Sequence, residues 1–288
     1  MTTSLRQHMH DAMRVSGFAL RTQRGYLEAI TKLARFYRVS PQRLTPAQIE
    51  AWLLHLIDER KLSYSTVNQA ASACRFLYGT VLKQDKSTFL VPMAKTPQRQ
   101  PDILGRAELA ALFAAAGNFK SQTLLMTIYA AGLRVSEACA LTIADIDSQP
   151  DRMCLRIQQG KGARDRYTLL PPTLLAQLRI YWRSERPRQW LFPVRSQTAG
   201  ISIISAQRCY QQARYAAGID KRGGIHALRH CFATHLLEAG VDLFTIQKLM
   251  GHQHLATTSR YLRLVSTQWR PPATANPLDL LAALPQSH

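Results

Sequence analysis

Residues 226–261 read HALRHCFATHLLEAGVDLFTIQKLMGHQHLATTSRY, and this stretch decides the fold of the second half of the 288-residue chain. Its apolar residues recur at three- and four-residue steps, as they do on the buried face of a helix. Glycines and capping residues interrupt the pattern at intervals. The stretch therefore predicts short helices joined by tight turns, at residues 227–239, 243–250 and 258–264.

The turns of this stretch carry polar residues at defined positions. Gly251 is expected to end the middle helix as a C-cap and so to turn His252 inward. Thr257 or Thr258 is expected to cap the third helix, whose first turns carry Tyr261. The pattern thus places an inward-facing histidine nine residues before a tyrosine at a helix start.

Before this stretch, the second half of the chain predicts further helices and one β-hairpin. Residues 153–158 and 166–170 are typical of strands, and Gly160-Lys161-Gly162 between them is typical of a turn. We expect a mostly α domain with a small antiparallel β-sheet at residues 105–288, ending in a short apolar tail helix at 277–285. Its other helices are expected at residues 106–115, 123–131, 137–141, 172–183 and 202–217.

The first third of the chain predicts a separate helical domain at residues 1–93. A helical pattern runs from residue 20 to 37, a second helix starts at Thr45-Pro46, and Ser63 or Ser65 can cap a third that runs through Val81. With the initial segment these make a compact four-helix domain. A basic stretch with three prolines between residues 91 and 101 indicates a linker, placed at 94–104.

The charge of the chain points to an anionic partner. Its 37 Lys+Arg against 18 Asp+Glu give a net charge of +19, which nucleic acid is suited to balance. No segment is apolar enough to span a bilayer, the N-terminus does not resemble a secretory signal, and the five scattered cysteines form no CxxC pair. We expect a cytoplasmic protein that binds nucleic acid. Contacts to DNA are expected from Arg21, Arg24, Lys32, Arg35, Arg75, Arg164 and Arg166.

Several segments of the second half together suit chemistry on a phosphodiester. In-line attack on phosphorus builds negative charge on the non-bridging oxygens, and fixed donors must meet that charge. Arg134 and Arg229 offer planar forks to a phosphate, and His252 can add a third donor. Tyr261 can form a reversible ester with phosphorus. The pattern favours an enzyme that opens and reseals a nucleic-acid strand.

Two further residues are candidates for proton transfer. His226 lies three residues before Arg229, hence on the same helical face, and can accept the proton of the phenol; a water is the alternative. Lys161, in the hairpin turn, can protonate the leaving deoxyribose oxygen. No metal and no ATP are expected, because the cations suffice and the phosphotyrosyl link stores the bond energy of the broken strand.

These segments resemble the catalytic patches of the tyrosine recombinase, or phage integrase, family over nearly the whole chain. GLRVSE, GKGARDR, HALRHCFATHLLEAG and LMGHQHLATTSRYL reproduce the family order Arg–Lys–His-x-x-Arg–His–Tyr, at a length similar to the compact Xer-like members. The resemblance implies that Tyr261 attacks the phosphorus and that Glu137 supports the first arginine. It implies assistance from Arg134, Lys161, His226, Arg229 and His252.

The resemblance also implies an architecture and partners. The domains would be a helical core-binding (SAM-like) domain and an α+β catalytic domain, forming a C-shaped clamp on DNA. The reaction would be site-specific integration or recombination at paired inverted-repeat sites, through a 3′-phosphotyrosyl intermediate. The protein would act as a tetramer whose tails dock on neighbouring subunits, with or without a partner recombinase. A tail packed on its own subunit is the alternative.

Other functions fit parts of the pattern. An accessory DNA-binding protein could keep the fold without turnover, and a type IB topoisomerase shares the chemistry without site preference. The complete residue set argues against the first, and the compact first domain and the HALRH patch argue against the second. A metal cluster of His226, His230 and His235 is disfavoured, since HALRH lacks the glutamate of HExxH. His230 and His235 are instead expected to pack or hydrogen bond on the buried side of the helix.

Overall fold

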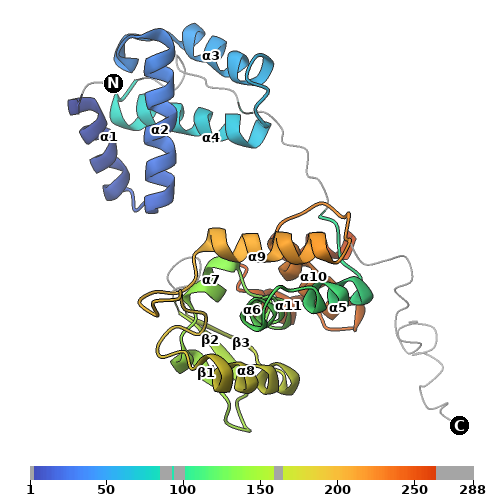
Figure 1. The fold of residues 1–288 in the computed structure, drawn as a ribbon. Helices are drawn as coiled ribbons and strands as arrows, with labels where there is room; N and C mark the ends of the chain where they lie inside the picture. The colour runs from blue at the N-terminus through green and yellow to red at the C-terminus, as the bar shows by residue number, and fades with distance from the viewer. Residues whose placement is uncertain (1–2, 85–92, 94–100, 159–164, 264–288) are drawn as a thin grey trace, which may run out of the picture. The chain divides into compact units, whose positions relative to one another are not determined.

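The computed structural model describes residues 3–84, 93, 101–158 and 165–263. The chain divides into two compact units, Met1–Arg99 and Gln100–His288 (Figure 1), and each is described by itself. Lys161, Arg164, the tail at 277–285 and most of the linker at 94–104 lie outside the described residues.

The N-terminal unit is helical, with one apolar core. Leu33, Trp52 and Tyr78 are buried at its centre. The Thr45 hydroxyl accepts from the backbone N–H of Gln48, and the Gln48 side chain accepts from the backbone N–H of Thr45, so a capping box starts α3 where the sequence predicts it. Its helices are α1 (Thr3–Val15), α2 (Leu20–Tyr37), η1 (Pro41–Arg43), α3 (Pro46–Asp58), α4 (Tyr64–Arg75) and η2 (Phe76–Val81).

The last helix of this unit changes its winding. Ser63, one of the two predicted caps, accepts a hydrogen bond from the backbone N–H of Thr66 and starts α4. The predicted helix continues to Val81, but its final part, η2, is a π-helix. Leu77, Tyr78 and Val81 of this part are all buried in the core. The unit therefore has the predicted four helices, with a wider final turn.

The C-terminal unit combines helices with a small sheet (Figure 1). Its main core is formed by apolar side chains such as Leu124, Ile128 and Leu228, all at most 1% exposed. The predicted helices are present, with ends that differ by up to four residues. They are α5 (Arg106–Ala114), α6 (Phe119–Ala130), α7 (Val135–Ala140), η3 (Ile143–Asp145), α8 (Pro172–Glu185), α9 (Ile203–Ala216), α10 (His226–Glu238), α11 (Leu243–Met250), α12 (Leu255–Ser259) and η4 (Arg260–Arg263).

The predicted hairpin is part of a three-stranded antiparallel sheet in the order β1-β2-β3. Its strands are β1 (Ile146–Asp147), β2 (Cys154–Ile157) and β3 (Arg166–Leu169). Leu155 of β2 pairs with Thr168 of β3, and both are buried. The Thr168 hydroxyl donates to the carbonyl of Ala131, which ties β3 to the segment after α6. The sequence did not predict β1, because two residues are too short for a periodic pattern.

The segment that leads to Tyr261 differs from the prediction. Gly251 caps α11 in the left-handed conformation (φ 62°), as expected. The next helix, α12, already begins at Leu255, so neither Thr257 nor Thr258 caps it, and the expectation of a cap at these positions is wrong. Thr258 is instead fully buried inside α12. The chain then tightens into the 3₁₀ turn η4, which carries Tyr261.

No helix in the described part of the chain combines the length and the apolar character needed to cross a lipid bilayer.

Candidate active site

Glu137 of α7 organises the first group of site residues. Its Oε2 accepts the backbone N–H of Arg134 at 2.7 Å, and its Oε1 accepts Nη1 of the same arginine at 2.7 Å. Arg166 of β3 reaches the same carboxylate with Nη1 and Nη2, again at 2.7 Å each. Because Glu137 stands at the third position of α7, it both caps the helix and clamps two guanidiniums.

The surroundings of Glu137 keep it ionised. Burial by itself would raise its pKa, but hydrogen bonds and charge from Arg166, together with those from Arg134, outweigh burial and hold the pKa at about 2. Arg229 adds a third cation, with Nη1 at 3.8 Å from Oε2. Three positive charges therefore meet one negative charge, and the cluster keeps an excess of positive charge.

The C-terminal end of α11 supplies the remaining anchors for these arginines. The last carbonyls of a helix have no partner within it, and they carry the negative end of the helix dipole. Three successive carbonyls here each accept from a different guanidinium. The pairs are Leu249 O with Arg166 Nε at 3.2 Å, Met250 O with Arg229 Nη2 at 2.5 Å, and Gly251 O with Arg134 Nη2 at 3.3 Å.

Arg229 of α10 is the most buried of the three arginines, at 1% exposure. Its Nη1 donates to the carbonyl of Gly132, a residue with φ +61° in the turn before Arg134. Burial and the nearby charge of Arg134 lower the pKa of Arg229 to about 9. The guanidinium is thus still protonated at neutral pH. Its hydrogen bonds to the carbonyls of Gly132 and Met250 hold it in place.

His252 follows the carbonyls of α11 directly. Its Nδ1 lies 2.8 Å from the hydroxyl oxygen of Thr258, which fixes the plane of the imidazole. The ring of His252 is nearly parallel to that of Tyr261, with 6.4 Å between centroids and 9° between planes. The buried threonine of α12 therefore orients a histidine that lies alongside the tyrosine.

Tyr261 is 1% exposed and packs in a small apolar cluster of its own unit with Phe232, Ile246 and Met250. Its hydroxyl oxygen lies 2.9 Å from Nδ1 of His230. Tyr261 is also close to Arg229, because an ionised Tyr261 would raise the pKa of that guanidinium. Within the described unit, Tyr261 therefore lies close to His230, His252 and Arg229.

The structure thus brings together Arg134, Arg229, His252 and Tyr261 of the predicted set. His226 is exposed at the start of α10, and its ring is in edge contact with that of His230, with centroids 4.8 Å apart. His230 and His235 are buried and hydrogen-bonded, as the sequence predicts.

Arg166 differs from its expected role. It was expected to contact DNA, but its side chain is 11% exposed, and all three of its guanidinium nitrogens contact Glu137 or the carbonyl of Leu249. It holds Glu137 and the end of α11 together within the unit.

Sequence reasoning missed the hydrogen bonds of His230 and Thr258 to site residues. For His230 a signal existed, since it stands four residues after His226 and so shares a helical face with it. For Thr258 the chain offered no local signal, because its partnership with His252 depends on how α12 folds back.

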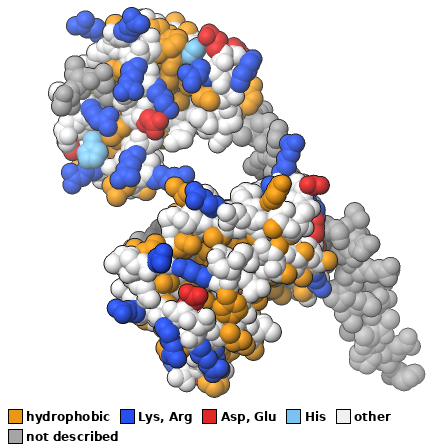
Figure 2. Space-filling view, in the orientation of Figure 1, with side chains coloured by type: hydrophobic (Ala, Val, Ile, Leu, Met, Phe, Trp, Pro, Cys, Tyr) orange, Lys and Arg blue, Asp and Glu red, His pale blue; other side chains and the backbone are white. Residues whose placement is uncertain are grey.

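The N-terminal unit presents basic side chains on its surface, where they outnumber the acidic ones on the visible face (Figure 2). On α2, Arg21, Arg24, Lys32 and Arg35 are exposed and lie along one face. Lys32 forms an exposed ion pair with Glu28 at 2.8 Å. The expected DNA contact Arg75 is also exposed, on α4.

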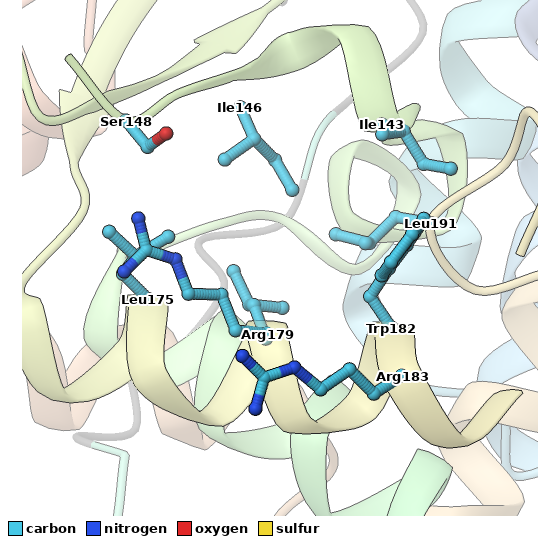
Figure 3. Close-up of a pocket in the computed structure, with 9 residues that line it drawn as sticks. Ile143, Ile146, Ser148, Leu175, Arg179, Trp182, Arg183 and Leu191 are labelled. Carbon is cyan, nitrogen blue, oxygen red and sulfur yellow. The ribbon is translucent and has the colours of Figure 1, made fainter. Parts of the chain in front are cut away.

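A pocket of about 400 Å³ lies on the C-terminal unit (Figure 3). It is formed by one side of α8, with Trp182, Arg179 and Arg183, facing Ile146 of β1. None of the candidate catalytic residues lines it. Among the residues that the structure describes, no group of three or more His, Cys, Asp or Glu side chains is arranged to hold a metal ion.

Comparison with known proteins places this arrangement in a family. The phage integrase family matches residues 103–267, and the phage integrase N-terminal SAM-like domain matches residues 5–88. The protein y4qK of Sinorhizobium fredii, grouped with integrases and recombinases, is 40% identical over 280 residues, 97% of this chain and 90% of its own. Tyrosine recombinase XerD of Caulobacter vibrioides is 34% identical over 232 residues, 74% of this chain and 75% of its own.

Solved structures agree on the fold. A lambda integrase dimer bound to a core site superposes with a TM-score of 0.75 at 19% identity, covering 94% of this chain and 98% of that one. The chain therefore belongs to the phage integrase family of tyrosine recombinases. It is an enzyme of site-specific DNA recombination and integration, which cleaves and rejoins DNA strands.

Proposed function

We propose that Tyr261 is the nucleophile of this recombinase and that Arg134, Arg229 and His252 bind the non-bridging oxygens of the attacked phosphate. A guanidinium has five N–H groups, so two contacts to the protein leave donors for a phosphate. The observation that carries the proposal is the position of Tyr261. The tyrosine is buried, its ring lies alongside that of His252, and it interacts electrostatically with Arg229. Fixed cations in a buried site stabilise the charge that develops in the transition state.

The remaining catalytic roles concern proton transfer and support. Lys161, in the segment between β2 and β3, protonates the leaving 5′-oxygen. His226, at the start of α10, assists next to the phosphate. Glu137 keeps the arginines in place through the hydrogen bonds described above. The product of cleavage is a 3′-phosphotyrosyl link, and the same groups act in reverse when the strand is rejoined.

The proposed partner is double-stranded DNA with paired inverted-repeat core sites. We propose that the two domains, residues 1–93 and 105–288 with a linker at 94–104, both contact this DNA. Arg21, Arg24, Lys32, Arg35 and Arg75 contact its backbone in this arrangement, and Arg164 adds a contact from the hairpin. Such contacts position the protein without reading sequence.

Assembly and location complete the proposal. Recombination between two sites requires four cleavages, so the active form is a tetramer on paired sites, formed by this chain alone or with a partner recombinase. The tail helix at 277–285 docks on a neighbouring subunit and closes the ring. The reaction takes place in the cytoplasm, where the substrate DNA is found.

Covalent trapping tests the nucleophile. Nicked duplexes tiled across the DNA that flanks the gene, where inverted repeats of roughly 10 base pairs are sought, serve as suicide substrates. The wild type is expected to form an SDS-resistant adduct on one of them, and Tyr261→Phe is expected to bind the same duplex without an adduct. An equal adduct yield in Tyr261→Phe would disprove the assignment. DNA binding without any adduct in the wild type would favour an accessory role.

A further inference from the structure

The hydrogen-bond partner of the Tyr261 hydroxyl is a residue to which the proposed function gives no role. The hydroxyl oxygen lies 2.9 Å from Nδ1 of His230, and the two side chains are 1% and 9% exposed. A general base must stand within about 2.6–3.2 Å of the proton that it takes. An imidazole nitrogen at this distance, shielded from solvent, meets that condition before any DNA is bound.

The position of His230 differs from that of its neighbour His226. Both stand on α10, and their rings are in edge contact, 4.8 Å between centroids and 79° between planes. The ring of His230 is also 5.6 Å from that of Tyr261, with 50° between planes. His230 therefore contacts both the exposed His226 and the tyrosine, and its Nδ1 lies at hydrogen-bond distance from the tyrosine hydroxyl.

The neighbouring position on the helix strengthens this arrangement. Arg229, the residue before His230, is fixed by hydrogen bonds to the carbonyls of Gly132 and Met250. Because consecutive residues of one rigid helix carry the phosphate-binding guanidinium and the imidazole, the distance between phosphate and base is set by the helix itself. A base supplied by a loop or by a water has no such fixed position.

We infer that His230 is the residue that accepts the proton of Tyr261 when the tyrosine attacks, an inference that rests on Tyr261 as the nucleophile. Neutral His230, protonated at Nε2, takes the phenolic proton on Nδ1. The bond between the tyrosine oxygen and phosphorus forms, and the bond from phosphorus to the 5′-oxygen breaks, with the departing oxygen protonated by Lys161. In rejoining, the 5′-hydroxyl attacks, and His230 returns its proton to the tyrosine.

The chain contains a second pair with the same geometry, which provides a control. His235 lies one turn further along α10, is also 9% exposed, and has its Nδ1 2.9 Å from the hydroxyl oxygen of Tyr129. Burial raises the pKa of Tyr129 and lowers that of His235. This pair is structural, so the same substitution in it measures what the loss of a buried histidine–tyrosine contact does to folding alone.

The test uses asparagine, whose side-chain oxygen can occupy the position of Nδ1 and accept a hydrogen bond but cannot take a proton. Trapping rates are measured on the nicked duplex that captures the wild type, for the full-length variants His230→Asn and His235→Asn. His230→Asn is expected to trap about 100-fold or more slowly while it binds the duplex like the wild type. His235→Asn is expected to trap at the wild-type rate, with a similar loss of melting temperature.

A second substrate locates the defect in the reaction. A duplex with sulfur in place of the 5′-bridging oxygen has a leaving group that needs no proton, so it is expected to restore Lys161→Ala and not His230→Asn. Restoration of His230→Asn by sulfur, or a trapping rate within about 3-fold of the wild type on the oxygen duplex, would overturn the inference. An adduct in Tyr261→Phe would overturn the proposed function as well. A slow His230→Asn alongside an inert Tyr261→Phe supports both.

If His230→Asn does not fold, His230→Gln and the nitrogen chemical shifts of His230 decide the matter. The wild-type protein is expected to carry the His230 proton on Nε2 and to leave Nδ1 as the acceptor. A spectrum that places the proton on Nδ1 would show that the histidine donates to the tyrosine, and His230 could then not serve as its base.

Discussion

Arg166 and Glu137 form a two-pronged ion pair, with Nη1 on Oε1 and Nη2 on Oε2 at 2.7 Å each. The pair joins β3 to α7. The strand β3 follows the segment that contains Lys161, and α7 begins at the residue after Arg134. Both side chains are nearly buried, at 11% and 7% exposure. The ion pair therefore connects two parts of the proposed site that are about 30 residues apart in the sequence.

Removal of the Glu137 charge should destabilise the C-terminal unit strongly. Glu137→Gln leaves the three arginines without their counter-charge, and breaking a buried ion pair typically costs about 3–5 kcal/mol. We expect a loss of this size in the free energy of unfolding, measured with urea. Glu28→Gln, which breaks the exposed pair with Lys32, is the control and should leave it nearly unchanged, because solvent screens an exposed ion pair. Equal effects of the two substitutions would contradict the central role of Glu137.

The same carboxylate should make stability depend on pH in the acid range. Its pKa is about 2 in the folded protein against an ordinary value of 4.5, so its charge stabilises the fold above pH 4.5. This contribution, about 3 kcal/mol, is lost as the pH falls from 4.5 toward 2. The difference in unfolding free energy between wild type and Glu137→Gln should therefore shrink between pH 7 and pH 3. A difference that stays constant would show that the carboxylate is not held ionised.

Gly251 should tolerate no side chain. A Cβ at this position would lie 2.6 Å from Cδ of Arg166, and the backbone has a φ of +62°. Gly218 has nearly the same φ, +66°, with nothing within 4 Å of a Cβ, so Gly218→Ala measures the backbone strain alone. We expect about 1–2 kcal/mol for Gly218→Ala and a further 1–3 kcal/mol for Gly251→Ala. Only Gly251→Ala should slow DNA cleavage, and an equal cost at both positions would refute the contact with Arg166.

Thr258 should act on catalysis through the orientation of His252. Thr258→Val keeps the buried shape and removes the hydroxyl that lies 2.8 Å from Nδ1 of the histidine. We expect cleavage to fall about 10- to 100-fold, since small errors in the placement of a catalytic group are costly. Thr127→Val, another fully buried threonine, should leave cleavage unchanged. Thr258→Ser should restore most of the rate, and a failure of that rescue would argue against the hydrogen bond.

The basic face of α2 should contribute to DNA affinity without sequence preference. Arg24→Gln removes one exposed cation, so binding should weaken similarly on all duplexes, and the slope of log affinity against log salt should decrease by about 1. Arg179→Gln, which changes a residue of the pocket on α8, is the matched control. A salt slope unchanged by Arg24→Gln would place this face of α2 away from the duplex.

Local patterns in the sequence predicted most of the elements. α2 and α11 have their predicted bounds because each has a clear apolar period and a distinct end, and Gly251 fixes the end of α11. The hairpin of β2 and β3 was predicted from alternation alone. The short strand β1 and the early start of α12 were not, because a few residues carry too little pattern to compete with tertiary packing.

The site shows the same division between local and distant information. The pairing of Glu137 with Arg134 follows from a spacing of three residues. The contacts of Arg166 with Glu137 and of His230 with Tyr261 join residues 29 and 31 positions apart. The spacing of His226 and His230 indicates a shared helical face, but no local pattern identifies a partner at such a distance in the chain. An arginine beside a basic hairpin resembles a surface contact in the sequence, and only the packing of β3 against α11 turns it inward.

The three backbone carbonyls at the end of α11 affect which substitutions the site can tolerate. Every amino acid carries the same carbonyl group, so an exchange of Leu249 or Met250 for another apolar residue leaves the acceptors of Arg166 and Arg229 in place. The anchor depends on the path of the main chain, and mutation of those side chains does not erase it. The anchor should therefore survive apolar substitutions at positions 249 and 250 that keep the packing of these side chains, whereas it depends on Gly251, which ends α11 in the left-handed conformation.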